Sequence, residues 1–190
     1  MKNNNLDHNT QIIAKYAGLL SIIEIGLGGF LHGLKLPFSG QILSLNQVFL
    51  LSHASLRLKE AGPIGIISTV SALFKTLSPA GKKLTPMLAI TVQGHLFASG
   101  LFIFGSNIIG RFVGAILSAL WAYIQPLCLY ILLFGEDIIF IYHYFFKKIS
   151  KVFNIDHSNF LIVIFLIILF KVLLSVCLLY TSDAADEEDS

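Results

Sequence analysis

Apolar stretches of roughly 17 to 22 residues recur along this 190-residue chain, separated by short segments rich in Gly, Pro, Asn or Lys. A helix of that length covers the ~30 Å hydrocarbon core of a bilayer. The predicted spans are residues 12–32, 40–57, 63–79, 84–105, 107–125 and 126–146. With 55% hydrophobic and only 13% charged residues, the chain does not have the composition of a soluble globule. The ~10-residue alternating segments of a transmembrane barrel are not seen. The sequence therefore predicts an all-α integral membrane bundle of about six transmembrane helices.

The final residues, VCLLYTSDAADEEDS, differ from the rest of the chain because they hold five of its eleven acidic residues. Residues 177–187 can be back-translated into a nucleotide sequence that resembles the mosaic-end transposon adapter of sequencing libraries. We therefore expect residues 177–190 to be adapter read-through and the native chain to be truncated near Val176. A genuine acidic, disordered cytoplasmic tail is the alternative. The expected domains are a six-helix domain at 1–158 and an additional apolar segment at 159–176.

The Lys and Arg residues predict the orientation, because cytoplasmic loops attract positive charge. Without the tail, six acidic residues stand against thirteen Lys and Arg, a net charge of about +7. If Gln125-Pro126 is a turn between two helices, one set of basic residues faces the cytoplasm: Lys2, Arg57, Lys59, Arg111, Lys147, Lys148 and Lys151. Lys35, Lys82 and Lys83 then lie outside. If Pro126 only kinks one long helix, the cluster KKISK is placed outside. The charge pattern favours the turn, and with it a multi-pass protein of the cell (inner) membrane with both ends inside.

Polar side chains within membrane spans are costly and are therefore candidates for function. The candidate substrate-binding residues are Gln41, Asn46, His53, Gln93, His95, Trp121 and Gln125. Their amides, imidazoles and indole suit a neutral or weakly charged heterocyclic ligand, because they offer donors, acceptors and a flat apolar face. We expect a pocket on the external half of the bundle, covered by the 33–41 loop. The alternative is that each polar group only bonds a neighbouring helix.

Small residues mark helix faces that can pack closely in a membrane. In the fifth span, a stripe recurs at every fourth residue: Ser106, Gly110, Gly114, Ser118 and Ala122. Packing inside the bundle is its expected role. In the first span, the candidate contacts for a separate partner helix are Ala14, Ala17, Gly18 and Ser21. Two ionisable residues in these spans, Glu24 and Arg111, either pair with each other or reach the interface by snorkelling.

Motifs of catalysis and cofactor binding are missing from the sequence. HExxH, GxSxG, paired CxxC and GxxxxGK[ST] do not occur. Outside the tail, Cys128 is the only cysteine, which excludes an intrachain disulfide. We expect no catalytic residue, metal, cofactor or nucleic-acid partner.

Two other classes of function stay open. A lipid-modifying membrane enzyme is suggested only by His143 with Glu136 and Asp137, and a stand-alone permease or scaffold explains the polar spans equally well.

Residues 12–135 resemble a substrate-binding S component of an energy-coupling factor (ECF) transporter. The resemblance rests on size, the small-residue first helix, the loop KLPFSGQ, and the segment LSPAGKKLTPMLAITVQGHLFASG. It implies capture of a vitamin or similar micronutrient from outside, followed by ATP-driven uptake. The implied partners are a coupling transmembrane subunit, two cytoplasmic ATPases and membrane lipid. In such families small residues of the first helix contact the coupling subunit. The sequence does not identify the substrate, and the apolar segment after residue 159 departs from a six-helix pattern.

Overall fold

The computed structural model describes residues 2–34, 39–78, 83–137, 143, 146–147, 162, 165–166 and 168–177. Five helices make up most of it: α1 (Lys2–Gly33), α2 (Ser39–Leu58), α3 (Ala61–Phe74), α4 (Leu84–Phe104) and α5 (Ile108–Phe134). Two short 3₁₀ segments, η1 (Lys75–Leu77) and η2 (Gly135–Asp137), follow α3 and α5. Residues 168–177 are also helical. Every regular element in the described ranges is a helix, which confirms the all-α prediction for them.

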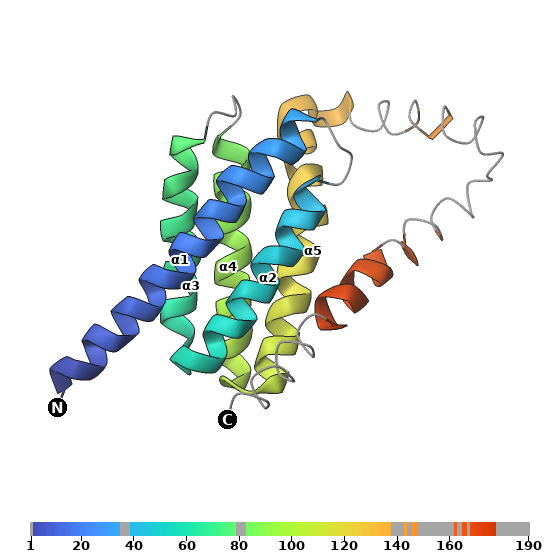
Figure 1. The fold of residues 1–190 in the computed structure, drawn as a ribbon. Helices are drawn as coiled ribbons and strands as arrows, with labels where there is room; N and C mark the ends of the chain where they lie inside the picture. The colour runs from blue at the N-terminus through green and yellow to red at the C-terminus, as the bar shows by residue number, and fades with distance from the viewer. Residues whose placement is uncertain are drawn as a thin grey trace.

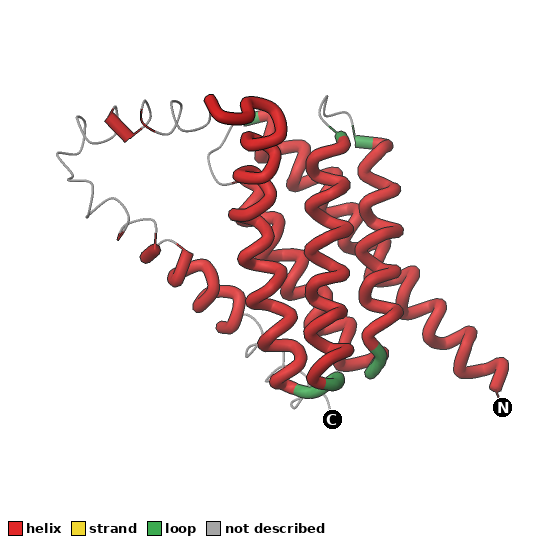
Figure 2. Tube along the Cα trace, turned by 180° about the vertical axis from the view of Figure 1, so that it is seen from behind, coloured by secondary structure: helices red, strands yellow, loops and turns green. Residues whose placement is uncertain are grey.

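Successive helices run in opposite directions and form one bundle (Figure 1). The most extensive packing joins α4 to α5 and α3 to α4, while α1 lies across α2 and α3. The N-terminal turns of α1 project beyond the other helices, as both views show (Figures 1 and 2). The C-terminal end of α2 and the start of α5 lie at one end of the bundle, and the start of α4 lies at the other. Arg57, Lys59 and Arg111 are therefore at the opposite end from Lys83.

In the part of the chain that the structure describes, three helical segments are long and apolar enough to cross a membrane: His8–Leu31, Leu84–Phe104 and Ile108–Pro126. Ala61–Leu77 is a shorter apolar helix. Large apolar side chains point out of the bundle, with Phe102 82% exposed and Ile22 70% exposed. Such side chains are stable on an outer surface when that surface faces lipid. The structure thus describes a membrane-type helical bundle, in which three of the described helices are long enough to span a membrane.

The predicted turn at Gln125-Pro126 is wrong, because α5 continues through Pro126 to Phe134. Proline has no N–H and leaves the carbonyl four residues earlier, that of Ala122, without its helical partner. The amide Nε2 of Gln41 donates to this carbonyl at 3.4 Å. A side chain from a neighbouring helix thus bonds the backbone group that the proline frees, which is how membrane helices tolerate proline. The predicted spans at 107–125 and 126–146 are consequently joined in one helix over residues 108–134.

The small residues of α5 pack against α4, as the stripe predicts. A Cβ atom added to Gly114 would lie 2.6 Å from the main-chain oxygen of Phe97, and one added to Gly110 would lie 2.0 Å from that of Gly105. One turn further along, the hydroxyl of Ser118 donates to the main-chain oxygen of Gln93. Glycine lets the two backbones approach to a distance at which no other residue fits.

A buried ion pair joins α1 to η1. The Lys75 ammonium donates to the Glu24 carboxylate at 3.2 Å and also to the Glu24 main-chain oxygen. Their side chains are only 2% and 4% exposed. The pairing of Glu24 with Arg111 is thus a wrong alternative, because Arg111 starts α5 at the other end of the bundle. Gly28 leaves room for the ammonium, since a Cβ atom there would lie 2.9 Å from Nζ.

Several predictions fall outside the described residues. These are the positions of Lys35, Lys82, Lys148 and Lys151, the central part of the 33–41 loop, and the tail after Cys177. The predicted boundary at residue 158 lies there as well. Within the apolar segment at 159–176, residues 168–176 are helical and contact the bundle through Lys171.

Candidate functional site

Three polar side chains follow one face of α2: Gln41, Ser44 and Gln47. Gln47 is 1% exposed, and its amide Nε2 donates to the main-chain oxygen of Ile90 at 2.7 Å and to the hydroxyl of Ser68 at 3.3 Å. This single amide therefore links α2 to α3 and α4. Gly94 serves the same junction, because a Cβ atom there would lie 1.9 Å from the Ser68 hydroxyl. At Gly94 the neighbouring helix α3 therefore approaches α4 closely.

Gln41 lies at the junction of α2, α5 and the helix at 168–177. While its Nε2 bonds the Ala122 carbonyl, its Oε1 accepts a hydrogen bond from the Lys171 ammonium. Lys171 is 4% exposed, and its Nζ lies 5.0 Å from the centre of the Tyr123 ring, a cation–π contact. No carboxylate of the described residues pairs with it. A buried ammonium without a counter-ion is energetically costly.

Two further predicted amides, Gln93 and Gln125, lie on α4 and α5. Gln125 is 8% exposed and its Nε2 donates to the main-chain oxygen of Thr85 at 2.8 Å. Gln93 is 4% exposed. Together with Gln41, these residues place three of the predicted amides in the region where α2, α4 and α5 meet. Two of the three bond neighbouring helices, as the alternative interpretation expects.

Two polar atoms in this same region have no hydrogen-bond partner among the described residues: the indole Nε1 of Trp121 and the hydroxyl of Ser44. Trp121 directly precedes Ala122, whose carbonyl Gln41 bonds, and Ser44 lies one turn along α2 from Gln41. A buried donor without a partner costs about 1–3 kcal/mol. Such groups in a folded protein usually bind a water or a ligand.

Three predicted site residues do not join this group. His53 lies twelve residues beyond Gln41 on α2, or about 18 Å along a helix, and its ring centre is 6.0 Å from that of Tyr16. His95 is exposed on the outer surface of α3 and α4, where its Nδ1 lies 3.0 Å from the Thr91 carbonyl. Asn46 is half-buried. The seven candidates therefore do not form one pocket.

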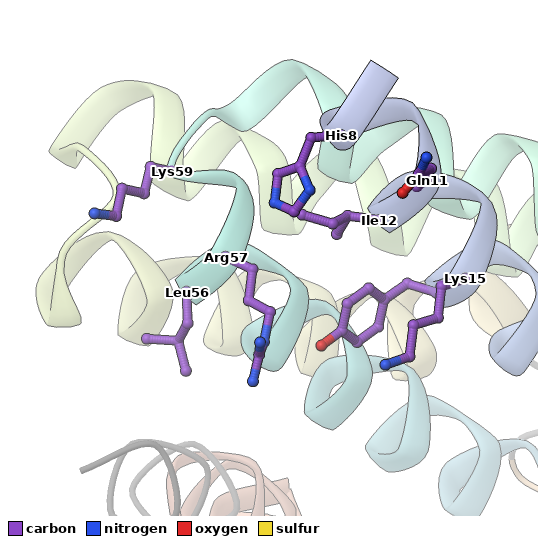
Figure 3. Close-up of a pocket in the computed structure, with 8 residues that line it drawn as sticks. His8, Gln11, Ile12, Lys15, Leu56, Arg57 and Lys59 are labelled. Carbon is purple, nitrogen blue, oxygen red and sulfur yellow. The ribbon is translucent and has the colours of Figure 1, made fainter. Parts of the chain in front are cut away.

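Open cavities of the described residues lie elsewhere in the bundle, and two of them are lined in part by basic side chains or by a predicted site residue. One, of about 520 Å³, is bounded by the first half of α1 and the end of α2 (Figure 3). The other, of about 440 Å³, is a groove between α3 and α4 that includes His95. Among the described residues, no group of three His, Cys, Asp or Glu side chains can hold a metal ion.

The four residues of α1 predicted to contact a partner helix differ in their exposure. Ala17 and Ser21 are 2% and 6% exposed, so they pack inside this bundle and are not open to a separate helix. Ala14 is exposed, and a Cβ atom on Gly18 would meet nothing within 4 Å. Only Ala14 and Gly18 of the four predicted residues are therefore accessible to a partner.

Sequence reasoning missed Ser44, Tyr123 and Lys171. Lys171 had a visible signal, because it is a single basic residue within an otherwise apolar stretch. Ser44 gave no such signal, since serine is common in membrane helices.

No protein-family model, curated protein or solved structure matches this chain.

Proposed function

We propose that this chain is a membrane substrate-capture subunit whose ligand binds where α2, α5 and the helix at 168–177 meet. Three groups on these elements carry the proposal. The Trp121 indole N–H and the Ser44 hydroxyl have no hydrogen-bond partner among the described residues. The Lys171 ammonium donates to Gln41 and has no counter-ion among those residues. A small molecule with acceptor atoms and a negative charge would supply the missing hydrogen-bond partners and the counter-ion.

The chemistry of these side chains indicates the kind of ligand. The Trp121 ring offers a flat apolar face with one donor at its edge. The Ser44 hydroxyl donates or accepts, and Lys171 supplies a positive charge. A heterocycle that carries a carboxylate or phosphate fits this combination, and many micronutrients are of this class. Entry requires the Gln41 bonds to open, and the one to Ala122 is long at 3.4 Å.

Uptake of such a ligand needs an energy source, for which the ECF resemblance supplies the proposed arrangement. A coupling transmembrane subunit would contact α1 at Ala14 and Gly18, and two cytoplasmic ATPases would drive transport. The protein would be a multi-pass protein of the cell (inner) membrane. The positive-inside rule would place the end with Arg57, Lys59 and Arg111 in the cytoplasm, so that the ligand site is on the external half.

Replacing Trp121 by Phe tests the ligand site, because the change removes the indole N–H and keeps an aromatic ring. We expect ligand retention to fall about tenfold, since one lost hydrogen bond is worth about 1–1.5 kcal/mol. The measurement is mass spectrometry of small molecules that co-purify with the chain in detergent. Phe112→Tyr, on the exposed start of α5, serves as a control for aromatic changes. Equal retention by wild type and Trp121→Phe would refute the site.

Replacing Gly18 by Leu tests the partner contact. Because nothing lies within 4 Å of the added Cβ, the bundle should fold and retain ligand as the wild type does. Co-purification of the ATPase subunits with the tagged chain should be lost, because leucine keeps a partner helix from close approach. The matched control is Gly62→Leu on α3, which is also open. Loss of the ATPases in both variants, or in neither, would contradict a specific contact at Gly18.

A further inference from the structure

The cavity between α1 and α2 is lined mainly by basic and polar side chains. α1 contributes His8, Gln11 and Lys15, α2 contributes Arg57, and Lys59 follows the end of α2. Figure 3 shows His8 and Ile12 of α1 across the space from Leu56 and Arg57 of α2. The volume of about 520 Å³ is large enough for a small ligand or a lipid headgroup.

The charge of this cavity is not balanced by its own lining. Lys15, Arg57 and Lys59 carry three formal positive charges, and none of the eight lining residues is acidic. The Lys15 and Lys59 side chains take part in no ion pair within the described part of the chain. Glu60, the next residue after Lys59, is exposed and does not line the cavity. The cavity is therefore suited to an anion.

The cavity also lies at the expected depth of a membrane interface. The first apolar segment begins at His8, and Lys15 follows two turns later. Ile12 and Leu56 add an apolar wall beside the charged groups. Lys and Arg side chains at this depth extend their charged ends toward the headgroups while their methylene groups stay in apolar surroundings. Basic pockets between membrane helices bind anionic headgroups for this reason.

We propose that this cavity binds a phosphate group, presented by an anionic membrane phospholipid. Lys15 and Lys59 would act as point charges on the phosphate, and Arg57 adds a third positive charge to the same cavity. The glycerol and first acyl carbons would contact Ile12 and Leu56. A soluble phosphate ester shares the same chemistry and would use the same basic side chains without the apolar wall.

The test compares lipid binding by the full chain in detergent, using native mass spectrometry with phosphatidylglycerol and with phosphatidylcholine. We expect the anionic lipid to be retained at least tenfold more than the zwitterionic one. In the variant Lys15→Gln/Arg57→Gln/Lys59→Gln, retention of phosphatidylglycerol should fall by about 100-fold, because each basic group near a headgroup contributes about fivefold. In the single variant Lys59→Gln, retention of phosphatidylglycerol should fall about fivefold. This variant still tests the proposal if the triple variant does not fold stably.

Lys83→Gln is the control, since Lys83 is exposed at the other end of the bundle. It should retain phosphatidylglycerol as the wild type does. A second arm adds inorganic phosphate to the lipid-free protein and measures its melting temperature. Stabilisation by phosphate that is lost in the triple variant, without preference for phosphatidylglycerol, would keep the phosphate site and assign it to a soluble ester. Equal binding of both lipids with no effect of phosphate, or equal loss in Lys83→Gln, would overturn the proposal.

Discussion

Replacing Lys75 by Met is expected to lower the free energy of unfolding by about 3–5 kcal/mol, because it leaves a buried carboxylate without its partner. The Glu24 side chain is 4% exposed and pairs with Lys75 at 3.2 Å. Methionine has a similar length but offers neither charge nor donor. The Glu24 main-chain oxygen loses its bond to the ammonium as well. The change should appear as a large drop in the fraction of monodisperse protein after heating in detergent.

The double variant Glu24→Gln/Lys75→Met separates the loss of charge pairing from damage to packing. It removes both charges and should recover most of the lost stability, since a neutral amide is far less costly to bury than an isolated carboxylate. Lys83→Met is the matched control, because Lys83 is exposed near the same end of the bundle. It should change stability by no more than about 0.5 kcal/mol. If Lys75→Met is as stable as Lys83→Met, the ion pair does not hold α1 to η1.

Replacing Gly100 by Ala should prevent α4 and α5 from closing on each other. The added Cβ would lie 2.4 Å from the main-chain nitrogen and 2.6 Å from the Cα of Gly114. Both are backbone atoms, so no side-chain rotation can relieve the overlap. We expect a loss at or above the upper end of the 1–3 kcal/mol that overpacking typically costs. The measurement is the same heating assay, together with the yield of folded monomer.

Gly26→Ala is the control for this prediction, because a Cβ atom there meets nothing within 4 Å. It makes the same chemical change in a helix and should leave stability unchanged or slightly higher, since alanine favours helix over glycine. A difference in stability between the two variants therefore reports the contact between the α4 and α5 backbones and cannot result from the higher helix propensity of alanine. Similar melting temperatures for Gly100→Ala and the wild type would mean that α4 and α5 are further apart than described.

The helical membrane class and the packing of α5 were predictable because both are local properties of the sequence. Apolar length indicates a span, and glycine at every fourth residue indicates a close helix contact. The described helices confirm the all-α class, and Gly110 and Gly114 lie against α4 as expected.

The errors concern groups whose partners lie far away in the chain. Pro126 is compatible with a turn or a helix, and the bond from Gln41 that satisfies the Ala122 carbonyl cannot be read from local sequence. In the same way, the partner of Glu24 depends on which helix ends lie together, and Lys75 is 51 residues away. The candidate site was predicted in part. Gln41, Gln93, Trp121 and Gln125 lie where α2, α4 and α5 meet, whereas His53 and His95 lie elsewhere.

The most direct test of the proposed ligand site is an experimental structure of the chain purified with its co-purifying small molecules. We predict non-protein density within about 2.7–3.2 Å of the Trp121 indole nitrogen, in contact with Ser44 and Lys171. A Trp121 nitrogen that bonds a protein carbonyl or a single water, with no other molecule beside Lys171, would contradict the account.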